Sequence, residues 1–215
     1  MIRAAIFDMD GVIIDSVNIH LKAAKRAFAN QGIKLTKEEM KFISARNPSD
    51  FNKFLSKKYK YDTERFILDH RKYYFKDYQK ARFYARTKRL IYHLKRLKVP
   101  IAMDTSSTDR MVHDVEKRMP LGKIFNAIVT FNDCSKRKPQ PDSYLMAAKR
   151  LKVNPKDCLV FEDSEIGVEA AKRAKMKCVA MPNKYTLDQD FSKADIIVQP
   201  DQKLGWRKLK EFFER

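Results

Sequence analysis

Short apolar segments rich in Ile and Val alternate with helix-like segments along most of this chain, and this alternation constrains the fold more than any other feature. A strand that is apolar at every position is buried on both faces, which is typical of a parallel sheet covered by helices. The expected strands span residues 4–7, 101–103, 127–129, 159–161, 179–181 and 196–198. The sequence therefore predicts the α/β class, with helices on both faces of a parallel sheet.

Three amphipathic helices are expected between these strands, over residues 109–118, 141–151 and 165–174. The last of them carries small apolar residues at helical spacing, which favours close packing against a sheet. A closing helix is expected over residues 204–213, with Trp206, Leu209 and either Phe212 or Phe213 buried.

One long segment interrupts the alternation. Between residue 17 and about residue 84 the pattern predicts no strand, and apolar residues such as Phe51, Phe54 and Leu55 fall at helical spacing instead. A helical insert of this size predicts a cap domain over residues 16–85, inserted into a Rossmann-like α/β core formed by residues 1–15 and 86–215. Residues 15–85 carry 17 Lys and Arg against 8 Asp and Glu, so the insert is basic.

Composition narrows the class of protein. The 215 residues are 44% hydrophobic and carry a formal net charge of +19, which is globular but attractive to polyanions. The basic residues are dispersed and show no nucleic-acid-binding signature, so we expect nucleic-acid binding to be incidental. We expect no membrane helix, and no signal peptide because Asp8 and Asp10 interrupt the first apolar stretch. Three widely spaced cysteines argue against disulfides or a zinc site and favour a cytoplasmic location.

Polar side chains follow four of the expected strands, at the point where each strand ends. They are Asp8 and Asp10, then Thr105, Ser106 and Ser107, then Lys138, and finally Glu162 and Asp163. Ligands of open α/β sheets bind beyond the carboxyl ends of the strands, where these residues are expected to meet. One acid after a strand is usually a turn former, but four such groups in one sheet indicate a functional site.

The chemistry that fits this set is phosphoryl transfer. Clustered carboxylates repel one another, and a bound cation relieves that repulsion. An all-oxygen donor set suits Mg²⁺, which also neutralises phosphate oxygens. An Asp can act as the nucleophile, and a second carboxyl two residues later can transfer the proton. A hydroxyl and a lysine would hold the remaining phosphate oxygens.

These segments resemble the four motifs of the haloacid dehalogenase superfamily, and the resemblance covers essentially the whole chain. The matching segments are Asp8 to Val12, Thr105 to Ser107, Lys138 to Asp142, and Phe161 to Ser164 with Gly167, Glu169 and Ala170. The chain is most similar to the branch of β-phosphoglucomutase-like phosphatases and mutases, whose members carry a helical cap between the first two motifs. The region 90–167 also resembles the pseudouridine-5′-phosphatase group.

The resemblance implies a role for each matching core residue. Asp8 is expected to be the nucleophile and a Mg²⁺ ligand, and Asp10 the general acid and base with its backbone carbonyl on the metal. Asp163 would be a further ligand, with Glu162 as a ligand or a supporting residue. The phosphoryl group is expected to lie on Thr105, Ser106 and Lys138.

The resemblance also implies roles outside these motifs. His20, Arg46 and Asn47 of the cap are expected to contribute to substrate specificity. The alternative is that His20 is an exposed or hinge-packed helix residue and Arg46 a solvated surface charge. Asp104 is a departure, because relatives usually have a small residue there. This extra acid could weaken phosphate affinity, pair with a lysine or point away from the site. We expect it to pair or to point away, because an unpaired buried carboxylate is costly.

The leading functional hypothesis is a Mg²⁺-dependent phosphatase that hydrolyses a small phosphorylated metabolite, a sugar or nucleoside phosphate, through an aspartyl-phosphate on Asp8. A sugar-phosphate mutase with the same intermediate is the alternative. A protein of another class, which binds nucleic acid through its basic cap without catalysis, is a third possibility. We expect the protein to be a monomer.

Overall fold

The computed structural model describes residues 1–44, 48–200, 209 and 211. The chain divides into two compact units, which we call the helical unit (Asp15–Arg82) and the core unit (Met1–Ile14 with Phe83–Arg215). The helical unit begins one residue before, and ends three residues before, the insert bounds of 16 and 85 expected from the sequence.

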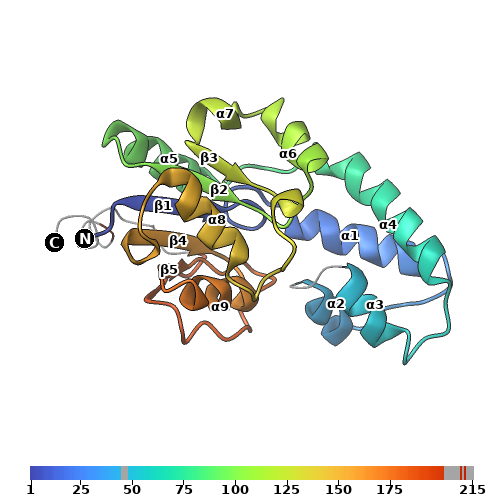
Figure 1. The fold of residues 1–215 in the computed structure, drawn as a ribbon. Coiled ribbons are helices and arrows are strands. Elements are labelled where there is room, and N and C mark those ends of the chain that lie inside the picture. Colours follow the sequence, from blue (N-terminus) through green and yellow to red (C-terminus); the bar gives the residue numbers. More distant parts are fainter. Residues whose placement is uncertain (45–47, 201–208, 210, 212–215) are drawn as a thin grey trace. The chain divides into compact units, whose positions relative to one another are not determined.

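The strands of the core unit form one parallel sheet with the spatial order β3, β2, β1, β4, β5, β6 (Figure 1). They are β1 (Ala4–Asp8), β2 (Ile101–Asp104), β3 (Ala127–Val129), β4 (Cys158–Glu162), β5 (Lys177–Ala180) and β6 (Ile196–Ile197). The register places Asp8 beside Asp104 and Phe7 beside Phe161. The carboxyl ends of β1, β2 and β4 therefore meet at one edge of the sheet.

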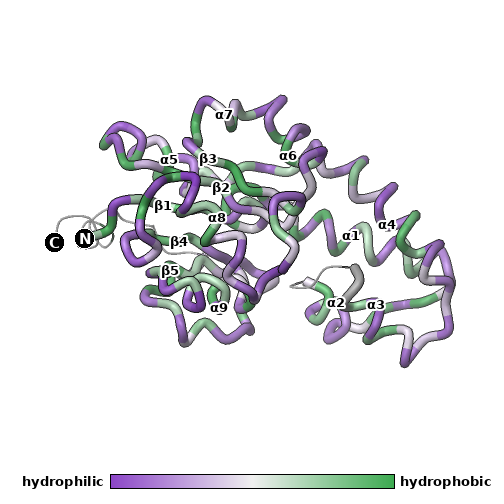
Figure 2. The backbone as a smooth tube through the Cα atoms, in the orientation of Figure 1, coloured by the Kyte–Doolittle hydropathy of each residue, from purple (hydrophilic) through white to green (hydrophobic). Residues whose placement is uncertain are grey.

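Helices cover both faces of this sheet, which confirms the predicted fold class. The helical elements are α5 (Ala85–Arg96), α6 (Asp109–Glu116), α7 (Leu121–Ile124), α8 (Asp142–Leu151) and α9 (Glu165–Arg173), with short 3₁₀ turns η1 (Phe131–Asp133) and η2 (Pro155–Asp157). Helix α8 packs against β1, β2 and β3, and α9 packs against β4 and β5. Figure 2 shows the strands largely in green and pale tones, within loops that are mostly purple.

Alternate residues of the central strands serve opposite faces of the sheet. Ile6 and Val160 belong to the core that α8 and α9 complete, with Tyr144 among the residues that these helices bury. Phe7 and Phe161 point to the other face, where their rings stack with centroids 4.5 Å apart. Burial on both faces explains why these strands are apolar at every position.

The helical unit consists of α1 (Val17–Ala29), α2 (Lys37–Ser44), α3 (Pro48–Leu55) and α4 (Thr63–Tyr78). Phe28 of α1, Phe51 of α3 and Phe66 of α4 meet inside it, with the rings of Phe28 and Phe66 4.3 Å apart. A side chain fixes the start of α4. Asp62 Oδ1 accepts a hydrogen bond from the Arg65 backbone N–H at 2.9 Å, which caps the amino end of α4.

The expected elements differ from the observed ones mainly at their ends. The fifth strand begins at Lys177 rather than at residue 179, because Lys177 pairs with Leu159 although its side chain is exposed. In the expected closing helix, Leu209 is helical and buried, whereas Trp206, Phe212 and Phe213 lie outside the described residues. Over the described part of the chain, none of the helices is both long and apolar enough to cross a bilayer. All three cysteines carry free thiols.

Candidate active site

Three carboxylates at the ends of neighbouring strands converge on the Lys138 ammonium. Lys138 Nζ lies 2.6 Å from Asp8 Oδ1 at the end of β1, 2.8 Å from Asp104 Oδ2 at the end of β2, and 2.9 Å from Glu162 Oε1 at the end of β4. The side chains are buried, since Lys138 is 6% exposed and none of its acidic partners exceeds 10%. The parallel register thus brings together acids that are far apart in the sequence.

Tyr144 of α8 completes the surroundings of this lysine. Lys138 Nζ donates to the Tyr144 hydroxyl at 2.9 Å and lies 4.5 Å from the centre of its ring. The same hydroxyl donates to Glu162 Oε1 at 2.9 Å. Because Tyr144 is fully buried in the sheet core, its hydroxyl holds Lys138 and Glu162 in place from the core side. The peptide bond between Lys138 and Pro139 is cis.

Burial and charge together set the protonation of this cluster. Burial raises the pKa of the Asp8 carboxyl well above its ordinary value, although Lys138 opposes the rise. Burial also raises the pKa of the Asp104 carboxyl, again against the opposing effect of Lys138. Burial also disfavours the Lys138 ammonium, but Asp104, Asp8 and Glu162 outweigh it and hold the pKa of Lys138 well above its ordinary value. The Glu162 pKa, raised by burial, is brought below its ordinary value by Lys138. Lys138 and Glu162 therefore form a stable charged pair.

Asp10 faces the loop that follows β2. Its Oδ2 accepts hydrogen bonds from the hydroxyls of Thr105 at 3.0 Å and Ser107 at 2.7 Å. The Ser107 backbone N–H donates to Thr105 Oγ1 at 2.9 Å, which fixes the turn between the two hydroxyls. Of the hydroxyls in this loop, Ser106 is exposed and makes neither of these contacts. The loop therefore orients the Asp10 carboxylate through Ser107 as well as the expected Thr105.

Glu162 and Asp163 follow each other but face different partners. Glu162 Oε2 accepts from the backbone N–H groups of Asp163 at 2.7 Å and Ser164 at 2.9 Å, so it holds the start of α9. Asp163 Oδ2 accepts from Asn183 Nδ2 at 2.7 Å. Burial, followed by repulsion from Glu162, raises the pKa of the Asp163 carboxyl well above its ordinary value.

Two glycines leave room for these carboxylates. A Cβ on Gly11 would lie 1.9 Å from Asp163 Oδ2, and Gly11 has φ +86°, a conformation that L side chains rarely adopt. A Cβ on Gly167 would lie 1.7 Å from Glu162 Oε1. Both glycines are therefore required by close approach to the acidic cluster.

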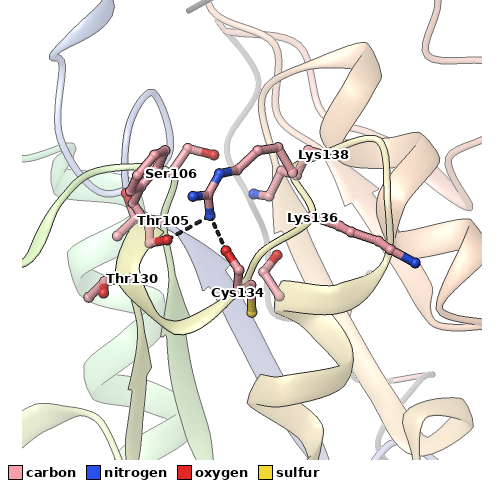
Figure 3. A pocket seen from close by; sticks show the side chains of 9 residues that line it. Thr105, Ser106, Thr130, Cys134, Lys136 and Lys138 are labelled. Atoms are coloured by element: carbon pink, nitrogen blue, oxygen red, sulfur yellow. Dashed lines mark hydrogen bonds between the residues drawn. The ribbon is translucent and has the colours of Figure 1, made fainter.

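A small pocket opens beside Lys138, between the loops that follow β2 and β3 (Figure 3). Its lining is hydroxyl-rich and basic: Thr105, Ser106, Thr130, Phe131, Cys134, Lys136, Arg137, Lys138 and Ser143. Arg137 stacks over the Phe131 ring and donates to the backbone carbonyls of Phe131 and Cys134, so its guanidinium stiffens the wall. The pocket chemistry suits a small oxyanion.

Comparison with known proteins identifies the family. Residues 5–181 match the family described as haloacid dehalogenase-like hydrolase. This chain belongs to that family. It is 32% identical over 225 residues to Beta-phosphoglucomutase of Bacillus subtilis, covering 99% of this chain and 96% of the relative. It is 31% identical over 177 residues to Phosphorylated carbohydrates phosphatase of Thermotoga maritima, covering 80% of this chain and 81% of the relative.

The solved structures agree with this family assignment. The crystal structure of β-phosphoglucomutase from Clostridium difficile superposes with a TM-score of 0.79 at 25% identity, and the match covers 99% of this chain and 97% of that one. The described residues of this chain therefore share the fold of that structure.

The metal site expected for such a hydrolase can be tested against these residues. Asp8 and Asp163 are buried carboxylates whose pKa values are raised by burial and by repulsion from neighbouring carboxylates, Glu162 first among them. Their oxygens are the donor type that Mg²⁺ prefers, and a cation would relieve this repulsion. Within residues 1–44, 48–200, 209 and 211, no three His, Cys, Asp or Glu side chains form a ready-made ion site. The residues fit Mg²⁺ in chemistry, and both oxygens of Glu162 already face protein donors.

Of the three cap residues expected to contact substrate, the structure describes only His20. His20 Nδ1 of α1 lies 3.1 Å from His70 Nε2 of α4, inside the helical unit. His20 also lies near the rings of Phe51 and Tyr74. Arg46 and Asn47 lie outside the described residues.

Sequence reasoning missed Tyr144, Asn183 and the contact of Ser107 with Asp10. Asn183 follows β5 at the same sheet edge as the acidic residues, so the strand-end pattern that predicted Asp163 also applied to Asn183. Tyr144 carried no such signal, because its helical spacing only predicts a core residue.

Proposed function

We propose that this protein is a phosphatase that hydrolyses a small phosphomonoester, such as a sugar or nucleoside phosphate. The observation that carries the proposal is the buried Asp8 carboxylate at the end of the central strand, 2.6 Å from the Lys138 ammonium. A carboxylate beside a cation and a hydroxyl-lined pocket combines a nucleophile with an oxyanion site. The similarity to Phosphorylated carbohydrates phosphatase of Thermotoga maritima supports the same reaction class.

In the proposed reaction, Asp8 attacks the phosphorus and the ester oxygen leaves as the phosphorus–oxygen bond breaks. Asp10, oriented by Thr105 and Ser107, gives its proton to that leaving oxygen. Asp10 then takes a proton from the water that attacks the aspartyl-phosphate, which releases phosphate and restores Asp8. Thr105 and Lys138 hold the phosphoryl oxygens through both steps, with Ser106 at the pocket rim.

Asp8 and Asp163, with the backbone carbonyl of Asp10, are the proposed holders of Mg²⁺. When bound, the cation supplies positive charge that lets a carboxylate approach an anionic phosphorus. We assign Glu162 the supporting role, because its oxygens accept from Lys138, Tyr144 and the start of α9. Asn183 orients Asp163 from the next strand-end loop.

The test is a turnover screen over phosphorylated metabolites, with Mg²⁺ and with EDTA. We expect hydrolysis of at least one sugar or nucleoside phosphate, its loss with EDTA and its recovery with added Mg²⁺. Hydrolysis that is indifferent to EDTA would contradict the metal assignment. No release of phosphate from any member of the screen would contradict the phosphatase.

A sugar-phosphate mutase is the second candidate, favoured by the similarity over nearly the whole chain to Beta-phosphoglucomutase. A mutase returns the phosphoryl group to a sugar before water reacts with the aspartyl-phosphate. Isomerised sugar phosphate that forms faster than free phosphate, and only with a sugar bisphosphate activator, would support the mutase over the phosphatase.

A further inference from the structure

Asp104 is the one carboxylate around Lys138 to which the proposed reaction gives no task. It is the last residue of β2, it lies beside Asp8 in the sheet register, and it is 0% exposed. Glu162 holds the start of α9, and Asp8 is the proposed nucleophile. A buried carboxylate with no task beside a phosphoryl site requires a physical explanation, because burying its charge is costly.

The contacts of Asp104 divide sharply between its two oxygens. Oδ2 lies 2.8 Å from Lys138 Nζ and accepts a hydrogen bond from the Ser143 hydroxyl at 3.3 Å. Oδ1 is buried and has no hydrogen-bond partner in the described part of the chain. Both partners of Oδ2, Lys138 and Ser143, line the pocket. Asp104 therefore lies directly behind the pocket wall and acts on it through these two side chains.

The Lys138 ammonium has more acceptors than it can satisfy. An ammonium carries three N–H bonds. Four oxygens lie within 2.9 Å of Lys138 Nζ: those of Asp8, Asp104, Glu162 and Tyr144. A phosphoryl oxygen can receive a hydrogen bond from Lys138 only by displacing one of them or by sharing its N–H.

We propose that Asp104 is a positioning residue that competes with the phosphoryl group for the Lys138 ammonium and so weakens the retention of phosphate. This inference rests on the proposed function only in placing a phosphoryl group beside Lys138. The negative charge of Asp104 also repels an incoming phosphate directly, since no second cation compensates its Oδ1 in the described residues. Asp104 thereby favours release of the product over tight binding of the anion.

The test measures binding of inorganic phosphate by calorimetry in the presence of Mg²⁺, for the wild type, Asp104→Asn and Asp104→Ala. Asparagine keeps the shape of the side chain and removes its charge, and alanine removes both. We expect the dissociation constant of phosphate to fall about tenfold in each variant, because one nearby negative charge is gone. The KM for a generic aryl phosphate should fall in parallel, whereas kcat should not rise with it.

Asp195→Asn is the matched control. Asp195 is a half-buried acid that also lies between two lysines, 2.7 Å from Lys172 Nζ and 2.7 Å from Lys177 Nζ. Unlike Asp104, it precedes β6 at the opposite edge of the sheet. It should change thermal stability and leave phosphate binding unchanged.

The outcomes separate this inference from the proposed function. Unchanged or weaker phosphate binding in folded Asp104 variants would overturn the inference, even if the wild type is an active phosphatase. Tighter phosphate binding in the variants of a wild type without turnover would support the inference and contradict the proposed function. Loss of folding in both Asp104 variants would also overturn it, because Asp104 would then be a structural requirement.

Discussion

The core unit and the helical unit bury their titratable groups in opposite ways. In the core unit, Asp8, Asp104 and Glu162 surround Lys138, so negative and positive charges are buried together. In the helical unit, His70 is buried at 4% exposure against His20 and aromatic rings. Burial, followed by the charge of His20, lowers the pKa of His70 to about 3. His70 is therefore buried as a neutral ring.

The difference teaches what each unit can do. A charged buried cluster needs its shared counter-charge, and removing Lys138 would leave uncompensated acids in a region of low polarity. The neutral buried ring of His70 needs no counter-charge, and acid makes its burial unfavourable. Only the first arrangement holds paired charges, which is why we propose the reactive site at the sheet edge of the core unit.

The largest expected effect comes from removing the proposed nucleophile. Asp8→Asn should lower turnover by at least about a thousandfold, because an amide does not form the covalent intermediate. It should not lower the melting temperature, since it removes one of three acids that share Lys138. Steady-state kinetics measures the turnover and thermal melts measure the stability. Activity near that of the wild type would contradict the assignment of the reaction to the core unit.

The next effect concerns the single cation of the core cluster. Lys138→Met should lower the free energy of unfolding by about 3–5 kcal/mol, because the buried acids lose their shared partner. Lys172→Met is the control, since Lys172 is 31% exposed and its pair with Asp195 should contribute less than about 1 kcal/mol. Urea unfolding of both variants decides, and equal losses would contradict the claim that the Lys138 cluster differs from ordinary ion pairs.

A glycine substitution tests how tightly Glu162 is packed in the core unit. Gly167→Ala should cost about 1–3 kcal/mol of unfolding free energy, because the new methyl group meets Glu162 Oε1. Gly122→Ala is the matched control in α7, where the nearest atom to the new methyl group is 3.7 Å away. We expect Gly122→Ala to be neutral or slightly stabilising. Equal destabilisation of the two variants in denaturant melts would show that Glu162 adjusts freely.

The last effect is the pH dependence of stability that His70 contributes in the helical unit. The unfolded chain binds a proton at His70 below about pH 6.5, and the folded chain does so only near pH 3. The free energy of unfolding should therefore fall as pH drops, by up to about 1.4 kcal/mol per pH unit between pH 6 and pH 4. His70→Phe should remove this part of the pH dependence, and His113→Gln, at an exposed position of α6, should not. Identical slopes for the wild type and His70→Phe would contradict the neutral buried ring.

The fold was largely predictable because strand burial leaves a direct trace in the sequence. Residues 4–7 and 159–161 are apolar throughout, and both lie inside buried strands. Strand ends were predictable for the same reason, so Asp8, Lys138 and Asp163 were expected at one edge. Thr105 was likewise expected there, and it contacts Asp10.

The direction of each side chain was not predictable. Nothing in the sequence indicates that both oxygens of Glu162 face protein donors. Nor does it indicate that Asp104 pairs with Lys138 instead of pointing away from the site. Tyr144 lies on a helix whose spacing predicts only burial, and the aim of its hydroxyl depends on how α8 packs. His20 finds His70 across fifty residues, a contact that only the packing of α1 on α4 creates.

The central claim is that Asp8 forms a covalent bond to phosphorus. The most direct measurement is an acid quench of the wild type during turnover of an aryl phosphate with Mg²⁺, followed by mass spectrometry of the peptide that contains Asp8. We expect a phosphoryl group on Asp8 of the wild type and none in Asp8→Asn. Sustained turnover with no phosphoryl group on that peptide at any quench time would contradict it.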